Sequence, residues 1–255
     1  MTCDQKKQLV IEQARRARML LRDGQQSLVL NLHPAKRRQV VSDFRACATR
    51  RDIMAFTKVY LDTGICQLTT EIESALDVLA AARPRTVCEI GTATGGNALL
   101  LSHALPDVDL FLGIDLYVNN KAYLRLLRPP LQRMVFFDNS SYAPETIAKV
   151  SKVLSSRKLD VLFIDGDHRY DGVKSDFLQY RHFVTEGGYI LFHDIMPDRG
   201  DGWFSSGGVP VLWNELKALY PHQEFVEDPD QQGFGIGMLR YSADIPLPLE
   251  FDSDC

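Results

Sequence analysis

The stretch Cys88–Leu101, CEIGTATGGNALLL, decides how this chain of 255 residues is expected to fold. An apolar run that contains Glu89 is followed by Gly91, Gly95 and Gly96, and then by an apolar stretch with helical spacing. Glycine destabilises the interiors of helices and strands, so a cluster of glycines between two ordered elements marks a turn with a special task. Three kinds of turn fit: a nucleotide-binding turn, a phosphate-binding loop and an ordinary corner between a strand and a helix.

The region around this turn alternates between strands and helices. Apolar runs predict strands at residues 86–90, 110–115, 134–138, 161–165 and 189–194. Helical spacing of apolar residues predicts helices at residues 96–105, 119–127, 144–156 and 171–184. Nearly continuous apolar strands are typical of a parallel sheet that helices cover on both faces. The pattern therefore predicts an α/β protein with a doubly wound, mostly parallel sheet.

The end of the chain adds to this sheet. Residues 223–228 and 233–240 are predicted to form a final antiparallel pair at the sheet edge. We expect a main domain at residues 64–242, followed by an irregular tail at residues 243–255.

The start of the chain is predicted to be helical. Residues 1–63 are expected to form an extension that acts as a cap or in oligomerisation, with a first helix that stops at Gly24. Thr70 and Glu73 have the spacing of a capping box at the start of the helix before strand 86–90.

Charge is distributed unevenly along the chain. Its net charge is −4, but residues 1–60 hold 13 Lys and Arg against 5 Asp and Glu, and the remainder holds 16 against 28. The acidic body argues against a nucleic-acid partner. The basic start is either a solvated helical face or an element that packs on an acidic body or meets an anionic substrate. Without a secretory pattern, a CxxC pair or a membrane-spanning apolar run, we expect a cytoplasmic location and no membrane partner.

The glycine turn lacks the marks of two common phosphate sites. A dinucleotide turn requires G-x-G-x-x-G, but Ala93 stands at the second glycine, and the lysine of a phosphate-binding loop is absent. The remaining pattern, E-x-G-x-x-x-G-G, can admit a nucleoside that carries an amino acid. Asp115 ends the next strand and can accept hydrogen bonds from both hydroxyls of a ribose. Together, the turn and this carboxylate favour a nucleoside ligand.

Three segments carry a family resemblance: VCEIGTATGG (87–96), FIDGDHRYDGV (163–173) and GGYILFHD (187–194). They resemble class I S-adenosylmethionine-dependent methyltransferases, and more narrowly the sugar and small-molecule O-methyltransferases of the macrocin O-methyltransferase and cephalosporin-hydroxylase-like group. The resemblance covers about residues 64–240. It implies a seven-stranded Rossmann-like sheet, S-adenosylmethionine as cofactor, and methyl transfer to a hydroxyl of a sugar or natural-product intermediate.

The resemblance also implies roles along the methionine part of the cofactor. Gly91, Thr92 and Gly95 would form the turn beneath it. Asn97, at the start of the following helix, would hold its carboxylate. Glu89 would support the turn and attract the ammonium group.

The other implied contacts lie at later strand ends. Asp115 would bind the ribose. Asp138, Asn139 and Ser140 stand where this fold usually contacts adenine. Asp165 ends the fourth strand and would face both cofactor and acceptor.

Acidic and imidazole side chains follow two neighbouring strands of the predicted sheet. Asp165 and His168 come after one strand, and His193 and Asp194 end the other. Deprotonating a hydroxyl requires a side-chain base or a metal ion that lowers the pKa of the hydroxyl. Related catechol-type enzymes have acidic metal ligands at the positions of Asp165 and Asp194. They have a further ligand at the next position, where this chain has Ile195. His193 either replaces that ligand or acts as the base, so dependence on Mg²⁺ stays open.

Two other functions fit a sheet of this kind. A nicotinamide-dependent oxidoreductase is disfavoured by the missing G-x-G-x-x-G, and a non-catalytic cofactor-binding protein by the four polar residues at the strand ends. The long loop at residues 196–210, with Trp203 and Phe204, is expected to close over the acceptor. The N-terminal helices are expected to join a homo-oligomer.

Overall fold

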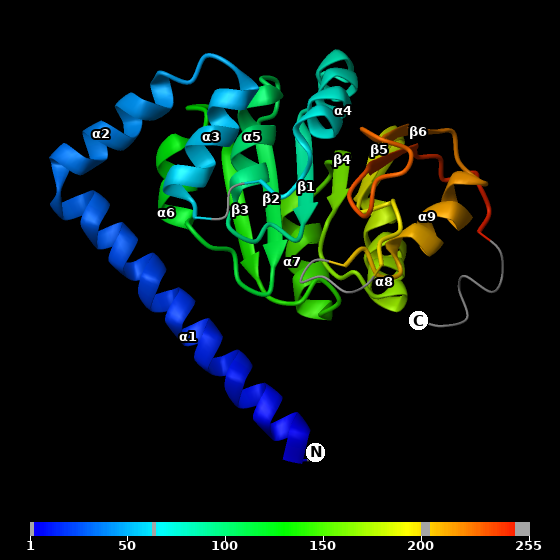
Figure 1. Cartoon of the computed structure of the whole chain (residues 1–255), viewed down its shortest axis with the longest axis horizontal. Coiled ribbons are helices and arrows are strands. Elements are labelled where there is room, and N and C mark those ends of the chain that lie inside the picture. The colour runs from blue at the N-terminus through cyan, green and yellow to red at the C-terminus, as the bar shows by residue number, and fades with distance from the viewer. Residues whose placement is uncertain (1–2, 63–64, 200–204, 248–255) are drawn as a thin grey trace.

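The computed structural model describes residues 3–62, 65–199 and 205–247. Its centre is a seven-stranded sheet with the order β3-β2-β1-β4-β5-β7-β6 (Figure 1). The strands are β1 (Thr86–Ile90), β2 (Leu110–Asp115), β3 (Arg133–Asp138), β4 (Leu159–Ile164), β5 (Val184–His193), β6 (His222–Phe225) and β7 (Ile236–Arg240). Strands β1 to β5 pair in parallel, and β7 is antiparallel to both β5 and β6. The predicted fold class and the final antiparallel pair are confirmed.

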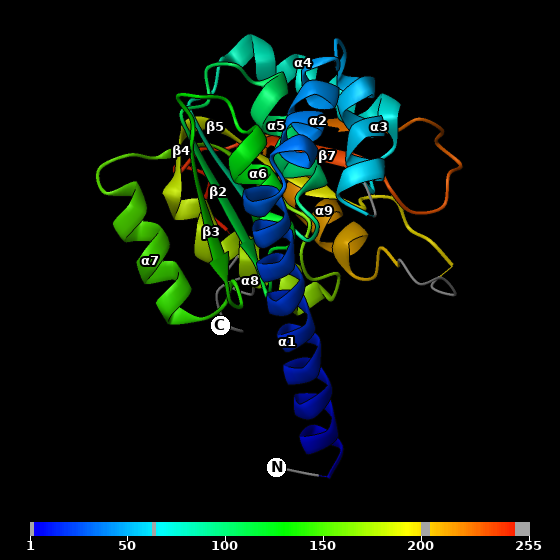
Figure 2. The same cartoon turned by 90° about the vertical axis from the view of Figure 1, so that its left-hand side faces the viewer.

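Helices cover both faces of this sheet. They are α1 (Cys3–Leu32), α2 (Pro34–Arg45), α3 (Arg50–Tyr60), α4 (Thr69–Ala82), α5 (Gly96–Ala104), α6 (Lys121–Leu127), α7 (Pro144–Leu154), α8 (Tyr170–Tyr180) and α9 (Val209–Lys217). Buried side chains of α3 to α6 form one apolar core with the sheet, and those of α7 to α9 form a second core. Figure 2 shows α7 across the sheet from α5 and α6.

The first helix differs from its prediction. It continues through Gly24 to Leu32, and Pro34 then begins α2. A glycine inside a helix costs about 1 kcal/mol relative to alanine, which the good helix formers around it can outweigh. The helix projects away from the sheet toward its N-terminal end (Figures 1 and 2). No helix among the described residues combines the length and apolarity needed to cross a membrane.

The predicted capping box at Thr70 and Glu73 is wrong. Helix α4 begins one residue earlier, so Thr70 lies in its first turn, and the residue before the helix makes no side-chain cap. Glu73 instead forms an ion pair with Arg51 of α3, with 2.9 Å between Oε2 and Nη2. A capping box does occur at the start of α3, between Thr49 and Asp52.

From β1, the chain adds strands first on one side of the sheet (β2, β3) and then on the other (β4, β5). β1 lies between β2 and β4, with Ile90 in register with both Ile114 and Ile164. In such sheets ligands bind at the carboxyl ends of the strands where this direction reverses. Helix α3 shares a core with α5 through Ile53 and Phe56, while the boundary expected at residues 63–64 stays a prediction.

Candidate functional site

The turn after β1 packs its backbone against the end of β4. Gly91 has a φ angle of +91°, and a Cβ atom there would lie 1.8 Å from the carbonyl oxygen of Asp165. At Gly95, with a φ angle of +81°, a Cβ atom would lie 2.5 Å from a methyl group of Leu124. Gly91 requires glycine for its conformation and for the close approach to backbone atoms, whereas Gly95 requires it for its conformation. The turn is therefore held in contact with the residue that follows β4.

Glu89 is buried directly before this turn. Its Oε1 accepts a hydrogen bond of 2.8 Å from Nδ2 of Asn97, while Oε2 has no hydrogen-bond partner among the described residues. Burial raises the pKa of Glu89 to about 8, and the hydrogen bond from Asn97 offsets only part of this effect. The hydroxyl of Thr92 lies 3.4 Å from the carbonyl oxygen of Glu89. The buried Oε2 is an unsatisfied acceptor that a cationic ligand group would satisfy.

The acidic residues that end β2 and β3 organise the loops beside them. Oδ2 of Asp115 accepts a hydrogen bond of 2.8 Å from the amide of Ala93, and Oδ1 accepts one of 3.0 Å from the amide of Tyr117. Oδ2 of Asp138 lies 2.6 Å from Nζ of Lys121. These bonds tie the glycine turn to the end of β2, and the end of β3 to α6.

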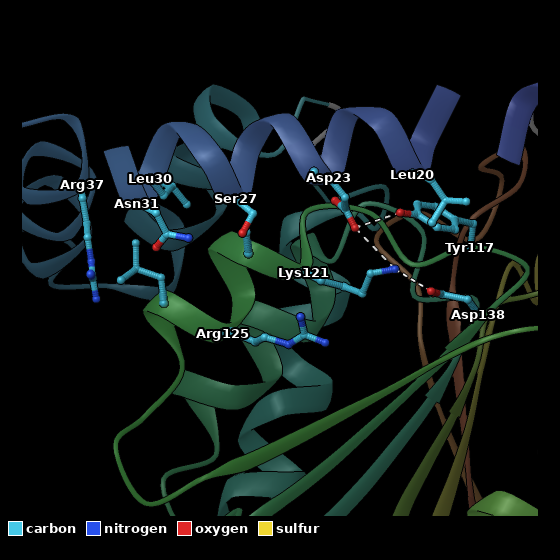
Figure 3. Close-up of a pocket in the computed structure, with 13 residues that line it drawn as sticks. Leu20, Asp23, Ser27, Leu30, Asn31, Arg37, Tyr117, Lys121, Arg125 and Asp138 are labelled. Atoms are coloured by element: carbon cyan, nitrogen blue, oxygen red, sulfur yellow. Dashed lines mark hydrogen bonds and ion pairs between the residues drawn. The ribbon is translucent and has the colours of Figure 1, made fainter. Parts of the chain in front are cut away.

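A hollow of about 580 Å³ lies between α1 and α6 (Figure 3). On its wall, Nζ of Lys121 lies 2.6 Å from Asp138 and 3.4 Å from Oδ2 of Asp23 on α1. Of the predicted site residues that the structure describes, Asp138 alone lines this hollow. Asn139 and Ser140 follow it, and Oδ1 of Asn139 accepts the amide hydrogen of Ser140 at 3.0 Å.

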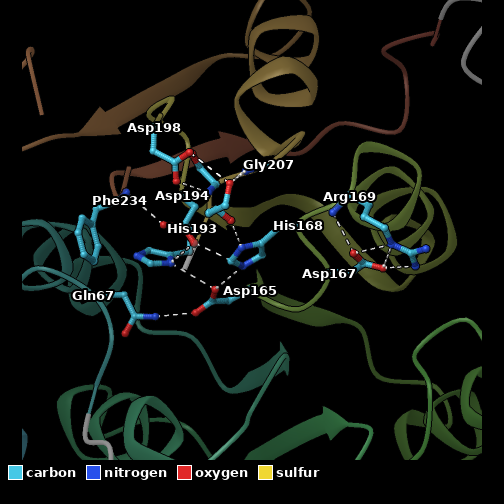
Figure 4. Close-up of polar contacts among 12 residues, drawn as sticks. Gln67, Asp165, Asp167, His168, Arg169, His193, Asp194, Asp198, Gly207 and Phe234 are labelled. Carbon is cyan, nitrogen blue, oxygen red and sulfur yellow. Dashed lines mark hydrogen bonds and ion pairs between the residues drawn. The ribbon is translucent and has the colours of Figure 1, made fainter. Parts of the chain in front are cut away.

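The four polar residues predicted at the ends of β4 and β5 come together in one cluster (Figure 4). Nδ1 of His193 lies 3.2 Å from both Oδ1 of Asp165 and Oδ2 of Asp194. Nε2 of His168 lies 3.4 Å from Oδ2 of Asp194 and 3.8 Å from Oδ1 of Asp165. Two imidazoles thus face two carboxylates at the ligand edge of the sheet. We call these four side chains the Asp–His cluster.

Charges within the Asp–His cluster stabilise one another. Asp165 raises the pKa of His168 to about 9, against the effect of burial. Burial lowers the pKa of His193, but Asp165 and Asp194 outweigh it and raise that pKa well above its ordinary value. Burial also opposes a charge on Asp165, yet His193 and His168 hold the pKa of this carboxyl at about 2. The two carboxylates therefore favour the protonated form of both imidazoles.

Neighbouring residues orient the Asp–His cluster. Gln67 is buried, and its Nε2 donates a hydrogen bond of 2.6 Å to Oδ2 of Asp165. Nδ1 of His168 lies 2.5 Å from the carbonyl oxygen of Ser205, which leaves Nε2 to face the carboxylates. Metal-binding histidines are commonly oriented by such a bond at the second ring nitrogen.

The loop that was predicted to act as a lid is described only in part. Trp203 and Phe204 lie outside the described residues. After them, Gly207 approaches His168 so closely that a Cβ atom would lie 2.2 Å from its carbonyl oxygen.

Reasoning from the sequence missed Gln67 and Phe234. Gln67 lies in a loop before α4, outside any motif. Phe234 fell within the predicted strand at residues 233–240, but β7 begins only at Ile236. That prediction is wrong at its start, because residues 233–235 have φ angles of +74°, +60° and +82°, which a strand cannot contain. An aromatic residue between two glycines was the signal that was available.

The family described as rhamnosyl O-methyltransferase/CmcI matches residues 53–211, which is more than half of the chain. The chain belongs to this family. The matched region includes the glycine turn and all four residues of the Asp–His cluster. Family membership thus agrees with the resemblance stated from the sequence.

Curated relatives add no named activity. An uncharacterized protein of Sinorhizobium fredii is 28% identical over 176 residues, which are 65% of this chain and 18% of that protein. An uncharacterized protein of Acanthamoeba polyphaga mimivirus is 56% identical over 41 residues, which are 16% of this chain and 19% of that protein. The chain spans about a fifth of the length of these relatives.

Solved structures share the fold. The O-methyltransferase TomG from Streptomyces achromogenes, solved in complex with SAM, has a TM-score of 0.53 at 15% identity and covers 77% of this chain and 91% of its own. An O-methyltransferase from Bacillus cereus in complex with SAH has a TM-score of 0.55 at 13% identity, with 80% and 96% covered. MycE of the mycinamycin pathway, solved with Mg, SAH and mycinamycin VI, has a TM-score of 0.53 at 14% identity, with 77% and 57% covered.

Proposed function

We propose that this protein transfers a methyl group from S-adenosylmethionine to a hydroxyl group of a small molecule, such as a sugar or a natural-product intermediate. One observation carries the proposal: the glycine turn after β1 lies in backbone contact with Asp165, which belongs to the Asp–His cluster. A turn without phosphate-binding features therefore stands directly beside groups suited to binding and deprotonating a hydroxyl. Membership in an O-methyltransferase family supports the same reading.

The residues along the turn fit the proposed cofactor. The unsatisfied Oε2 of Glu89 suits an ammonium group, and Asn97 lies beside it at the start of α5. Asp115 and Asp138 end the next two strands, where we place the ribose and the adenine. When bound, S-adenosylmethionine supplies a methyl group activated by a positively charged sulfur. The chain's own task is to align the acceptor and to remove its proton.

The Asp–His cluster fits a divalent cation. Asp165, His168 and Asp194 offer ligand atoms that lie within 4.8 Å of one another. Carboxylate oxygens suit Mg²⁺, whereas the imidazole also suits transition metals such as Mn²⁺. Such an ion supplies a lower pKa for a bound hydroxyl. His168 must be unprotonated to bind such an ion, so cation binding is expected to tighten as the pH rises.

Unassisted base catalysis by His193 is the competing route. Asp165 and Asp194 raise the pKa of His193 and so favour its protonated form, which works against its accepting a proton from the acceptor. A route through His193 alone would therefore quicken steadily toward alkaline pH. We favour the cation because ligand atoms of Asp165, His168 and Asp194 already converge on one point.

A methyl-transfer assay with labelled S-adenosylmethionine tests the proposed function. The acceptor panel contains rhamnosyl glycosides, phenols and amines, each with and without a chelator and with Mg²⁺ or Mn²⁺ added back. We expect transfer to a hydroxylated acceptor, loss with chelator, and a loss of at least about 100-fold in Asp165→Asn. A transfer rate that is unchanged by the chelator and rises with pH would identify His193 as the base that removes the proton of the acceptor. Full activity of Asp165→Asn would contradict the proposed site.

A further inference from the structure

The loop between β6 and β7 is fixed to the Asp–His cluster. The amide of Phe234 donates a hydrogen bond of 3.1 Å to Oδ1 of Asp194. On the other side, the buried carboxylate of Glu71 on α4 accepts hydrogen bonds from the amide of Gly235 at 2.9 Å and from Nε2 of Gln231 at 2.8 Å. The backbone around Phe234 is thus held by Asp194, which follows β5, and by Glu71 on α4.

This support keeps Phe234 in an unfavourable conformation. Phe234 has a φ angle of +60°, between two glycines that tolerate the left-handed region. A bulky residue in that region is an outlier. Such strain persists where the surrounding structure enforces it, and it gathers at functional sites. Glycine would adopt this conformation without strain, so what phenylalanine adds at this position is its phenyl ring.

The ring of Phe234 lies beside the Asp–His cluster and remains accessible. The residue as a whole is 36% exposed, and the centroid of its ring lies 6.2 Å from that of the His193 ring in an edge-to-face arrangement. Figure 4 shows Phe234 on the side of His193 that is turned away from Asp165. Nε2 of His193 is buried and has no hydrogen-bond partner among the described residues. An apolar surface and an unsatisfied nitrogen therefore lie next to each other.

We infer that Phe234 is the platform on which the apolar face of the acceptor rests, so that a hydroxyl on the same ring reaches the Asp–His cluster. The inference rests on the proposed function and narrows its substrate class. A pyranose ring presents a face of C–H groups, and an arene presents a flat face that can stack on phenylalanine. An open-chain polyol presents neither. Phe234 acts by positioning the acceptor and takes no part in proton transfer.

Substitutions of Phe234 separate this role from a structural one. Phe234→Gly removes the ring and also relieves the backbone strain, whereas Phe234→Tyr retains the ring. Val211→Ala, an exposed apolar position on α9, is the matched control. The probe is p-nitrophenyl α-L-rhamnopyranoside, titrated by NMR into protein loaded with S-adenosylhomocysteine. The melting temperature and the affinity for S-adenosylhomocysteine are measured on the same samples.

We expect Phe234→Gly to bind the rhamnoside about threefold to tenfold more weakly, as the loss of one aromatic contact implies. Its affinity for S-adenosylhomocysteine should be unchanged, and its melting temperature unchanged or higher. Phe234→Tyr and Val211→Ala should bind the rhamnoside within about twofold of the unsubstituted protein. Unchanged rhamnoside binding in Phe234→Gly, a lower melting temperature, or equal losses for both ligands would overturn the platform.

The two proposals fail in different ways. Unsubstituted protein that takes up S-adenosylhomocysteine but not the rhamnoside contradicts the platform and leaves the proposed function standing. Protein that takes up neither compound contradicts the proposed function itself.

Discussion

Glu89 is a buried carboxylate whose protonation is coupled to the stability of the fold. Its pKa is raised to about 8 from an ordinary 4.5, because burial disfavours the charged form. The folded state therefore holds this proton more tightly than the unfolded state does. The resulting stability is fully present below pH 4.5 and is lost as the pH rises through 8. A bound ammonium group would offset that loss.

The substitution Glu89→Gln separates the two effects. The amide cannot ionise, so the free energy of unfolding should fall less between about pH 5 and pH 9, by more than about 1 kcal/mol relative to the unsubstituted protein. Affinity for S-adenosylhomocysteine should fall about tenfold, because a charge-assisted hydrogen bond is lost. Chemical denaturation across this pH range, together with calorimetric titration, measures both. Parallel pH profiles and equal affinities would show that Glu89 has neither role.

Site residues at the ends of strands could be predicted from the sequence, whereas those in loops could not. Asp165, His168, His193 and Asp194 could be placed together because the carboxyl ends of neighbouring parallel strands meet. Gln67 could not, since its contact with Asp165 spans 98 positions in the chain and depends on how a loop folds back. The implied roles of Asn139 and Ser140 stay predictions, and their side chains support the local turn in this structure.

The turn from β1 to α5 contains the glycine whose added Cβ atom would come closest to another described atom. An alanine at position 91 would place its Cβ 1.8 Å from the backbone of Asp165, at a φ angle of +91°. Gly24 lies within α1, and a Cβ atom there would meet no described atom within 4 Å beyond the helix's own backbone. We therefore expect substitution by alanine to have opposite effects on stability at positions 91 and 24.

Gly91→Ala should destabilise the fold by more than about 1 kcal/mol and abolish binding of S-adenosylhomocysteine, because the turn must move away from β4. Gly24→Ala, the matched control, should stabilise α1 by about 0.5–1 kcal/mol and leave binding intact. Thermal unfolding and titration of both variants check this. Normal stability and binding in Gly91→Ala would show that the close approach at this turn is unnecessary.

Strand positions were predictable from apolar runs, whereas helix ends were less so. The strands at residues 86–90 and 110–115 agree with β1 and β2 to the residue. Local sequence signals predicted two helix ends wrongly: the start of α4 and the end of α1. Thr70 is a residue type that commonly caps a helix, but α4 starts one residue before it. Gly24 is a residue type that commonly ends a helix, but the segment around it favours helix and α1 continues through it.

At the scale of the whole molecule, α1 has an outward face without a described partner. Leu30 on this helix is buried against the body, whereas Leu21, Leu28 and Leu32 are 67%, 58% and 69% exposed. Their spacing of seven and four residues places them on one stripe of the helix, opposite Leu30. Exposed apolar stripes of this kind are typical of helix–helix contacts.

We propose that a second copy of the chain covers this stripe. The small residues Ala14 and Ala17 continue it on the N-terminal side of Leu21. In an antiparallel pair centred on Leu21, Ala14 would face Leu28 of the second copy, so that small side chains meet large ones. The sequence predicted oligomerisation through this segment but not the direction in which the helix projects.

Sedimentation velocity tests the pairing. The unsubstituted protein should sediment as a dimer at micromolar concentration, and the double substitution Leu21→Glu with Leu28→Glu should yield a monomer with an unchanged melting temperature. Leu131→Glu, at a position that is 94% exposed outside α1, should leave the dimer intact. A monomeric unsubstituted protein, or dissociation by Leu131→Glu as well, would contradict the pairing.

The measurement that bears most directly on the function is a calorimetric titration of the protein with S-adenosylhomocysteine, run beside NADH and repeated with Gly91→Ala. We predict one site of micromolar affinity for S-adenosylhomocysteine, no uptake of NADH, and loss of the site in the variant. Uptake of NADH without uptake of S-adenosylhomocysteine would contradict the proposed function.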